Sequence, residues 1–409
     1  MTRILAVNTS PRASGRDLAV AASKLPTVAS LLGYIETHSC LTRSRLSNSE
    51  VYLLAAIWEA QKAGVHVDYV PVCEPSYGAR LGECRRECDG LLLGGPVYFG
   101  DRSSLAETFL RALPDGNGRP FAAVACGAKR NGGQETSLVY QMMDALAAGW
   151  TVVGNDAATT SQYGGTGVAG DVGSARRDGY GLDTSRGTGR RLAAVASTLA
   201  GTAKARPRVL ALVLADDEGA ALDVARTVTD GLDAEIIDLT AADIRRCIAC
   251  DLCPTEHGPD EDYRCIIAAK GDWLAQNHGR LLGADLIIPI VYDSPRAVSV
   301  YQRFLERSRY IRRSDYILRG AVVCPVVLYD AGRIGVMHLR MSTAWMRHNT
   351  VISRAGVVMR GGDVLRAAHA VAEAHHVARN MAAAPRADVT YSAVGYGISK
   401  ARDAREGRV

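Results

Sequence analysis

Four of the ten cysteines lie in one short segment, RRCIACDLCPTEHGPDEDYRCI, with a spacing that could hold a metal. Cys247, Cys250 and Cys253 follow a C-x2-C-x2-C pattern, and Cys265 comes after a gap of eleven residues. Three closely spaced thiolates and a fourth from beyond a loop can hold a [4Fe–4S] cluster. Zinc sites more often use separated Cys-x2-Cys pairs. The pattern favours a cluster over zinc and over a metal-free thiol patch, and His257, inside the gap, is an alternative ligand.

A second kind of chemistry is indicated by three turns that follow apolar runs in the first half. They read NTSPR at 8–12, GGPVYFGDRSS at 94–104 and CGAKRNGGQE at 126–135, and a further turn, SRLSNS at 44–49, opens a helix. Hydroxyls and backbone N–H groups at a helix N-terminus can bind an anion. Ser47 or Asn48 is also a good helix cap, which is the simpler interpretation. The pairing with Ser-Pro-Arg favours a phosphate site, and the glycine-rich turns could meet a planar ligand.

The turns must be positioned by the apolar runs, which alternate with helical patterns. The runs predicted as strands cover residues 4–8, 66–72, 90–98, 121–126 and 151–154, and the helical patterns cover 49–63, 104–113 and 135–148. Strands that are apolar throughout are typical of a parallel sheet covered by helices on both faces. Ligands of such sheets bind beyond the carboxyl ends of the strands, where the three turns lie.

The pattern restarts in the second half, after the linker KARPR at 204–208. Strands are predicted at 209–215, 234–239, 284–292, 321–329 and 349–353, and helices at 220–229 and 363–384. A Gly-rich stretch covers 163–189, within which Tyr163 to Gly181 is expected to form a flexible flap, and a helix follows over 190–203. We therefore expect an α/β protein of two doubly wound domains, 1–203 and 209–384, each with a five-stranded parallel sheet, and a polar tail, 385–409.

Composition narrows the function classes. The chain has 409 residues, with 48 basic and 43 acidic side chains, so its net charge of +5 gives no argument for nucleic acid. No apolar run approaches the ~20 residues of a membrane span, and the N-terminus MTRILAVNTSPR does not resemble a signal peptide. We therefore expect a cytoplasmic protein that binds neither membrane nor nucleic acid, with thiols kept reduced.

SPR…SNS, PVYFG and the GGQE turn together resemble the NAD(P)H-dependent FMN reductase and iron–sulfur flavoprotein group of the flavodoxin-like superfamily. The resemblance covers residues 1–203, and more loosely 208–384, as a tandem duplication of a flavodoxin-like domain. It implies that the first turn holds the FMN phosphate and that the next two frame the flavin ring. Carried over by motif, the phosphate residues are Ser10, Arg12, Ser47, Asn48 and Ser49, and the ring residues are Pro96, Val97, Tyr98, Phe99, Gly127, Gly132 and Gly133.

The resemblance also implies an oxidoreductase that passes electrons between NAD(P)H or a ferredoxin and a quinone or other small electrophile. A cluster bound by Cys247, Cys250, Cys253 and Cys265 would be a second redox centre. The family assembles so that the cluster of one subunit lies near the flavin of a neighbour, and in this duplicated chain the two would meet either within one chain or across a homo-oligomer, which we expect. The alternative is a non-enzymatic electron-transfer or redox-sensing flavoprotein. Hydride transfer requires no side-chain acid or base, so the sequence identifies no catalytic residue.

This chain departs from the family pattern in two places. About thirty residues, 13–45, separate the two phosphate elements, and their apolar content predicts packed helices that either cover the flavin or contact a second subunit. In the second half the first turn reads LADDEG, 214–219, whose carboxylates would repel a phosphate. We expect no FMN in that domain.

Overall fold

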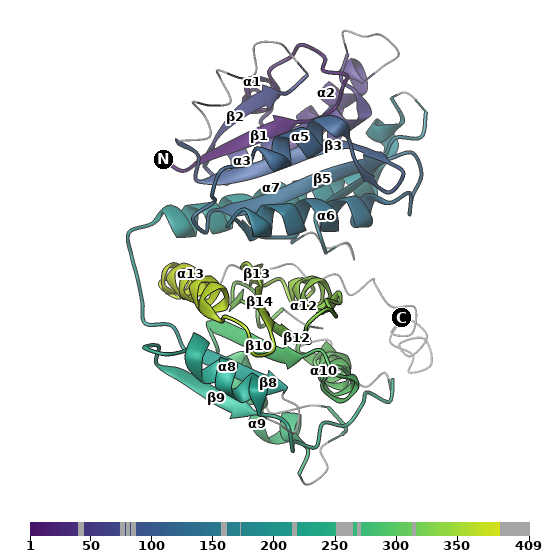
Figure 1. The fold of residues 1–409 in the computed structure, drawn as a ribbon. Coiled ribbons are helices and arrows are strands. Elements are labelled where there is room, and N and C mark those ends of the chain that lie inside the picture. Colours follow the sequence, from purple (N-terminus) through teal and green to yellow (C-terminus); the bar gives the residue numbers. More distant parts are fainter. Residues whose placement is uncertain are drawn as a thin grey trace. The chain divides into compact units, whose positions relative to one another are not determined.

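The computed structural model describes residues 1–39, 45–73, 78, 82, 87–156, 162–171, 173–214, 219–250, 265–267, 271–312 and 316–384. The chain divides into two compact units, Met1–Ala203 and Lys204–Val409 (Figure 1). None of the helices in these ranges carries an apolar stretch long enough to cross a membrane. Outside the described residues lie the predicted ligand Cys253, the alternative ligand His257, the acidic residues 216–218 and the tail 385–409.

The first unit is built on a parallel sheet. Its strands are β1 (Arg3–Asn8), β2 (His66–Pro71), β3 (Gly90–Tyr98), β4 (Asp101–Arg102), β5 (Pro120–Gly127), β6 (Thr151–Val152) and β7 (Gly165–Val168). Its helices are α1 (Leu18–Ser23), α2 (Val28–His38), α3 (Asn48–Lys62), α5 (Ser104–Arg111), α6 (Gln134–Ala147), the 3-10 turn η1 (Ser174–Arg177) and α7 (Gly179–Ala200). The order is β2-β1-β3-β5, and β6 and β7 both pair with β5 in parallel. Among the strands described in this unit, only the short β4 runs antiparallel, against β3.

Helices cover both faces of this sheet because its strands are apolar throughout. Residues Ile4 to Val7 of β1 are at most 1% exposed, and all eight residues of β5 are buried. The helices α3 and α7 pack on one face, against β3 and β5, and α6 packs on the other with α5 beside it (Figure 1). The predicted α/β class is confirmed.

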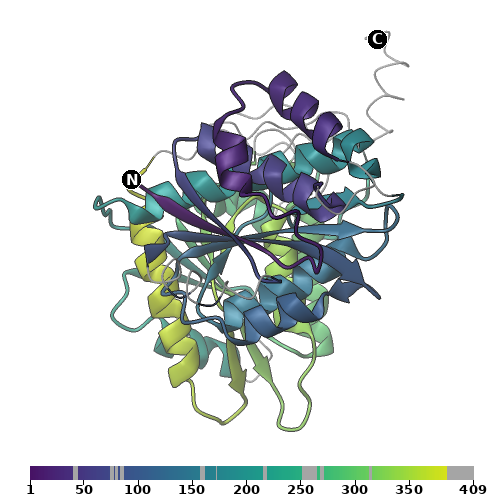
Figure 2. The same ribbon diagram turned by 90° about the horizontal axis from the view of Figure 1, so that it is seen from above.

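The long insertion forms the helices α1 and α2, as expected. Asp17 caps α1, and Thr27 caps α2 in a reciprocal pair with Ser30, which satisfies the free N–H groups of each first turn. Both helices contact α3, and they are coloured purple in Figure 2. The Trp58 indole and the Gln61 amide of α3 donate to backbone carbonyls at Leu25 and Ala19. The excursion is therefore a packed part of the first unit.

The expected flap was wrong, because most of the Gly-rich stretch is regular structure. Residues 165–168 form β7, and α7 begins at Gly179, eleven residues before the predicted helix start. A Cβ at Gly189 would lie 1.9 Å from the Ala56 carbonyl oxygen of α3. Glycine here allows α7 and α3 to approach closely, whereas from the sequence alone the glycines were interpreted as a sign of chain flexibility.

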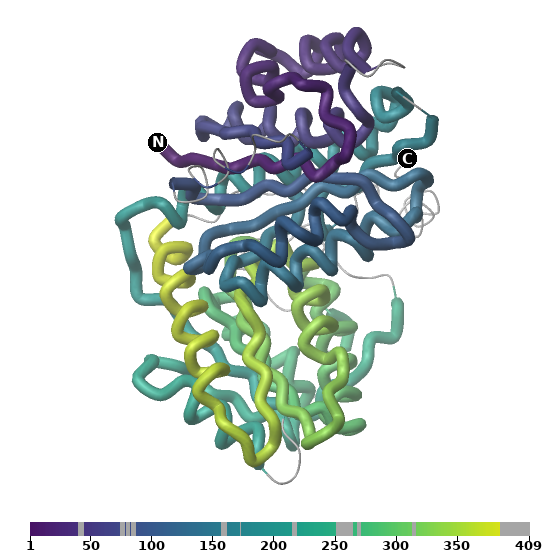
Figure 3. Tube along the Cα trace, turned by 45° about the horizontal axis from the view of Figure 1, so that its top comes forward, coloured from purple at the N-terminus to yellow at the C-terminus, as the bar shows by residue number. Residues whose placement is uncertain are grey.

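The second unit repeats the strand order. Its strands are β8 (Val209–Leu214), β9 (Ala234–Asp238), β10 (Leu286–Tyr292), β11 (Val322–Val323), β12 (Val326–Tyr329), β13 (Val351–Ile352) and β14 (Gly356–Met359). Its helices are α8 (Ala220–Val228), α9 (Trp273–Leu282), α10 (Pro295–Arg307), α11 (Arg309–Arg312), α12 (Met337–Met346) and α13 (Leu365–Met381). The order is β9-β8-β10, then β11 with β12, then β13 with β14, all parallel. Helix α13, yellow in Figure 3, packs along β14.

The predicted strand at 321–329 is interrupted. Cys324 and Pro325 separate β11 from β12, because proline has no N–H to donate to the ladder. Both pieces pair with β10, so the interruption changes the hydrogen bonding and leaves the strand order intact.

Candidate functional site

The three turns singled out in the first half meet at the carboxyl ends of β1, β3 and β5. The Thr9 N–H donates to the Gly94 carbonyl at 2.8 Å, and the Ser103 hydroxyl donates to the Thr9 carbonyl at 2.8 Å. A Cβ at Gly95 would lie 2.1 Å from Oγ1 of Thr9, so only glycine fits between the first two turns. This is the edge at which open α/β sheets bind ligands.

The first predicted phosphate turn is tightened by its own side chains. The Ser10 N–H donates to Oδ1 of Asn8 at 2.9 Å, and the Arg12 N–H donates to Oγ of Ser10 at 3.2 Å. Ser10 is buried, whereas Arg12 is exposed. A rigid turn that presents one exposed guanidinium suits a phosphate, whose oxygens match the planar fork of donors.

The second phosphate element is the N-terminus of α3. Ser47 is its N-cap: the Ser47 hydroxyl accepts from the Glu50 N–H, and the Glu50 carboxylate accepts from the Ser47 N–H. The Asn48 amide donates to the carbonyls of Ala169 and Asp171, so this side chain fastens the chain after β7. Ser49 is buried. The Asn48 side chain is therefore occupied within the protein and that of Ser49 is covered, so the backbone N–H groups of this first turn are the better phosphate donors.

Glu50 links the two phosphate elements, and sequence reasoning missed it. Its carboxylate is fully buried and accepts from the N–H and the hydroxyl of Ser14, both at 2.9 Å, and from the Ser47 N–H at 2.8 Å. The Tyr69 hydroxyl of β2 completes the set at 3.4 Å. The signal was present, since SNSE has the spacing of a capping box. Burial and the Glu50 charge raise the pKa of Tyr69, which stays neutral.

The first predicted ring turn is the hairpin between β3 and β4. Pro96 and Val97 are half-buried, Tyr98 is 49% exposed, and Phe99 is completely exposed. Phe99 has φ of 52° and Gly100 has φ of 79°, as in the two-residue turns that join twisted strands. A bulky residue rarely adopts a positive φ, so this backbone conformation is held by the surrounding hairpin.

The second ring turn lies directly against that hairpin. A Cβ at Gly133 would lie 2.5 Å from Cα of Gly100, and Gly133 itself has φ of 93°. Cβ atoms at Gly127 and Gly132 would lie 2.8 Å from the Gln134 amide and 2.7 Å from the Lys129 carbonyl. Gly133 therefore lets the two ring turns approach each other, whereas Gly127 and Gly132 make room for Gln134 and Lys129 within the second turn. Gln134, which sequence reasoning did not assign, supports the turn by donating to the carbonyls of Lys129 and Gly167.

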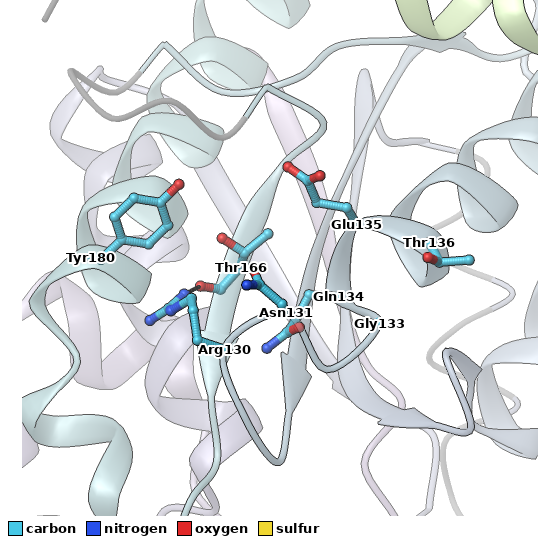
Figure 4. A pocket seen from close by; sticks show the side chains of 8 residues that line it. All are labelled: Arg130, Asn131, Gly133, Gln134, Glu135, Thr136, Thr166 and Tyr180. Atoms are coloured by element: carbon cyan, nitrogen blue, oxygen red, sulfur yellow. Dashed lines mark hydrogen bonds between the residues drawn. The ribbon is translucent and has the colours of Figure 1, made fainter. Parts of the chain in front are cut away.

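A cavity of about 250 Å³ lies beside the second ring turn, at the N-terminus of α6 (Figure 4). Its charged side chains are Arg130 and Glu135, and Thr166 and Tyr180 line it from β7 and α7. The Arg130 guanidinium lies 4.7 Å from the centre of the Tyr180 ring and donates to the Thr166 carbonyl at 2.8 Å. It also pairs with Asp178, so its position is fixed.

The same carboxylate, Asp178, organises the polar groups beneath the cavity. The Tyr52 hydroxyl oxygen lies 2.9 Å from the Asp178 carboxylate and 2.8 Å from the Val168 carbonyl. Burial, followed by the Asp178 charge, raises the pKa of Tyr52. Burial also raises the pKa of Cys126 to about 12, so this strand-end thiol is protonated at neutral pH and is not a nucleophile. The site thus combines the charged groups Arg130, Glu135 and Asp178 with a tyrosine hydroxyl and a thiol that stay protonated.

In the second unit the structure describes three of the four predicted cysteine ligands. Cys247, Cys250 and Cys265 are each half-buried free thiols. Within the described residues no three Cys, His, Asp or Glu side chains are gathered as a metal site. Ala249 has φ of 52°, and its N–H donates to Sγ of Cys247 at 3.4 Å. An N–H bond to sulfur is one of the ways by which proteins stabilise cluster-bound thiolates, so the described part of the segment suits such a group.

The fold and this edge define a class. When the short β4 is left out and β6 and β7 are counted as one last strand, the strands of the first unit follow the order 2-1-3-4-5. This is the order of the flavodoxin-like doubly wound proteins, and the three turns occupy the crevice where such proteins bind their nucleotide. Residues 2–164 match the NADPH-dependent FMN reductase family. This match confirms, for that part of the chain, the resemblance inferred from the SPR…SNS, PVYFG and GGQE turns.

Individual proteins are similar to parts of this chain. An iron–sulfur flavoprotein of Methanocaldococcus jannaschii is 40% identical over 116 residues, which cover 27% of this chain and 60% of that relative. A WrbA-like flavodoxin from Agrobacterium tumefaciens is 15% identical, with a TM-score of 0.28, covering 48% of this chain and 97% of the other. RosB with bound 8-demethyl-8-formylriboflavin-5′-phosphate is 16% identical, with a TM-score of 0.32, covering 63% of this chain and all of RosB.

Proposed function

We propose that the protein is an FMN-dependent oxidoreductase that takes electrons from NAD(P)H or a ferredoxin and passes them to a quinone or another small electrophile. The observation that carries the proposal is the meeting of three turns at one sheet edge, within the residues that match the FMN reductase family. When bound, FMN supplies the hydride and electron chemistry, and the protein supplies its position and surroundings.

The chain's own residues would hold FMN in two parts. Arg12, Ser10 and the first turn of α3 bind the phosphate. The buried Glu50 carboxylate joins the two phosphate elements and keeps this first turn at a fixed distance from β1. The hairpin around Phe99 and the turn at Gly133 frame the ring. The absence of bulky side chains at the glycines lets backbone N–H groups face the ring edge, where they bind more rigidly than long side chains would.

The second unit would hold a [4Fe–4S] cluster in place of a flavin. Cys247, Cys250, Cys253 and Cys265 are the proposed ligands, and the bond from the Ala249 N–H to Cys247 supports the assignment. The acidic residues 216–218 would disfavour a phosphate at the corresponding position of this unit. One chain would then carry one flavin and one cluster, in a homo-oligomer that lets electrons pass between them.

The test is purification without oxygen, followed by quantification of flavin, iron and sulfide. We expect one FMN and about four irons per chain. Oxidation of NADH or NADPH is then followed with a quinone as acceptor. Protein with two flavins and no iron, or with neither cofactor, would contradict the proposal. Bound cofactors with negligible turnover would instead indicate the electron-transfer module.

A further inference from the structure

We propose that Arg307 is a positioning residue that closes the base of the cysteine segment by tying its entry, two residues before Cys247, to its exit, two residues after Cys265. This inference rests on the proposed cluster. It concerns a feature that the motif leaves unexplained, the gap of eleven residues between Cys253 and Cys265. A gap of that length lets the fourth thiol lie far from the first three unless the chain after Cys265 is held close to the chain before Cys247.

Arg307 is held in one orientation at the end of α10. Its side chain and that of Asp272 are both 0% exposed, and Nη1 and Nη2 each lie 2.9 Å from a different carboxylate oxygen. Asp272 is itself fixed, because it caps α9 by accepting from the Ala275 N–H at 3.1 Å. A buried bidentate pair of this kind fixes the direction of the remaining guanidinium N–H bonds.

Those N–H bonds reach both ends of the cysteine segment. Nη1 donates to the Arg245 carbonyl at 3.1 Å, and Nη2 donates to the Ile267 carbonyl at 3.0 Å. Arg245 lies two residues before Cys247, and Ile267 lies two residues after Cys265. One guanidinium group therefore joins the entry and the exit of the segment that contains all four predicted ligands.

Neighbouring contacts anchor the same base. Asp243 and Asp272 form a parallel β-bridge, and the Trp273 N–H donates to the Asp243 carbonyl at 2.9 Å. Arg303, one helical turn before Arg307, donates to the Ile244 carbonyl at 3.4 Å. The entry of the segment is thus fastened to α9 and α10, and Arg307 alone among these contacts also binds the exit.

This arrangement favours Cys265 over His257 as the fourth ligand. Cys265 is two residues from a carbonyl that is fixed beside the entry, so little of its freedom remains to be lost when a cluster binds. His257 lies near the middle of the gap, at a large distance in sequence from both fastened ends. A long gap is then compatible with a compact ligand set because its two ends are clamped together.

The test compares Arg307→Lys with the wild-type protein. Lysine keeps the positive charge for Asp272 but presents a single nitrogen, which cannot hold the carboxylate and both carbonyls as the planar fork does. Arg354→Lys is the matched control, because Arg354 also pairs with a carboxylate, Glu373, in the second unit. If Arg307→Lys does not fold, the double variant Arg307→Met with Asp272→Asn removes both charges and keeps an oxygen to cap α9.

Two measurements are made on each variant: iron and sulfide per chain after reconstitution with limiting iron, and amide hydrogen exchange of the metal-free full-length protein. We expect Arg307→Lys to lose at least fivefold in bound iron, as Cys265→Ser does, whereas Arg354→Lys and His257→Asn keep the wild-type content. We also expect amide exchange at residues 245–250 and 265–267 to rise at least tenfold in Arg307→Lys and to stay at the wild-type level in Arg354→Lys.

The outcomes separate the inference from the proposed function. If the wild-type protein binds no iron, the cluster proposal fails, and the exchange data alone decide whether Arg307 closes the segment. If the wild-type protein binds iron and Arg307→Lys binds as much, with unchanged exchange, the positioning role is overturned. Loss of iron in Arg354→Lys as well would also overturn it, because the effect would then be a general one on the unit.

Discussion

Arg12 is the residue at which phosphate binding is most directly tested. Its side chain is exposed, and its backbone N–H already holds the turn through Ser10. Arg12→Met should therefore leave the melting temperature unchanged and weaken FMN binding roughly tenfold to a hundredfold, since a charged hydrogen bond contributes about 1.5–3 kcal/mol. Fluorescence titration of the flavin measures the affinity. Arg16→Met, an exposed arginine of the same segment, is the control and should bind FMN normally.

Gly133 tests the close approach of the two ring turns. Gly133→Ala adds a Cβ 2.5 Å from Cα of Gly100 and also requires alanine at φ of 93°. Gly64→Ala is the control, with φ of 86° but nothing within 4 Å. The control should lose about 1 kcal/mol of unfolding free energy, from the backbone alone. Gly133→Ala should lose at least about 1 kcal/mol more and bind FMN weakly. Equal unfolding free energies in urea would contradict a close approach.

The residues that sequence reasoning found and those it missed differ in one respect. Ser10, Arg12 and the glycines are recognisable from their neighbours along the chain. Glu50, Gln134 and Arg307 act through partners such as Ser14, Gly167 and Ile267, which are distant in sequence. A motif records the groups that meet the ligand, whereas the side chains that fix those groups depend on the tertiary fold.

At the scale of single elements, the end of α12 carries a buried histidine that should make stability depend on pH. His348 follows this helix, with its Nε2 3.2 Å from the Ser308 hydroxyl. Burial, and then the charge of Arg312, lowers its pKa from 6.5 to about 3. Between these values the unfolded chain binds a proton that the folded chain does not, so stability is full above pH 6.5 and falls as the pH decreases. The slope from this group is about 1.4 kcal/mol per pH unit.

The measurement is urea unfolding at pH 7 and pH 5. Between pH 7 and pH 5 the free energy of unfolding should fall by about 2 kcal/mol less in His348→Gln than in the wild-type protein. His369→Gln replaces an exposed histidine and should lose as much as the wild type. If His348→Gln keeps the wild-type dependence on pH, His348 is protonated in the folded protein.

Element boundaries show where local patterns are sufficient. The apolar strands β1, β3 and β8 lie within one or two residues of their predicted ranges, because a buried parallel strand is apolar at every position. β7 and the first half of α7 were missed, since glycine there serves close packing against Tyr52 and Ala56. The low propensity of glycine for helices and strands is here outweighed by tertiary contacts, which cannot be recognised from the local sequence.

At the scale of the whole molecule, the proposed function gives each unit a ligand of its own, and each unit should then respond to its ligand separately. FMN at about a hundred times its dissociation constant stabilises the state that binds it by about 2.7 kcal/mol. Scanning calorimetry should therefore show two transitions, of which added FMN raises only one and removal of iron lowers only the other. A single transition that moves with both ligands would show that the two units unfold as one.

The exposed phenylalanine at the tip of the β3–β4 hairpin has a consequence for attempts to engineer the protein. Phe99 occupies a left-handed backbone position that glycine or asparagine adopts more readily. A screen that selects only for heat tolerance should therefore replace it early. Variants selected in this way would gain thermal stability but lose the aromatic side chain proposed to border the cofactor. Selection for activity should therefore keep Phe99, whereas selection for heat tolerance should replace it.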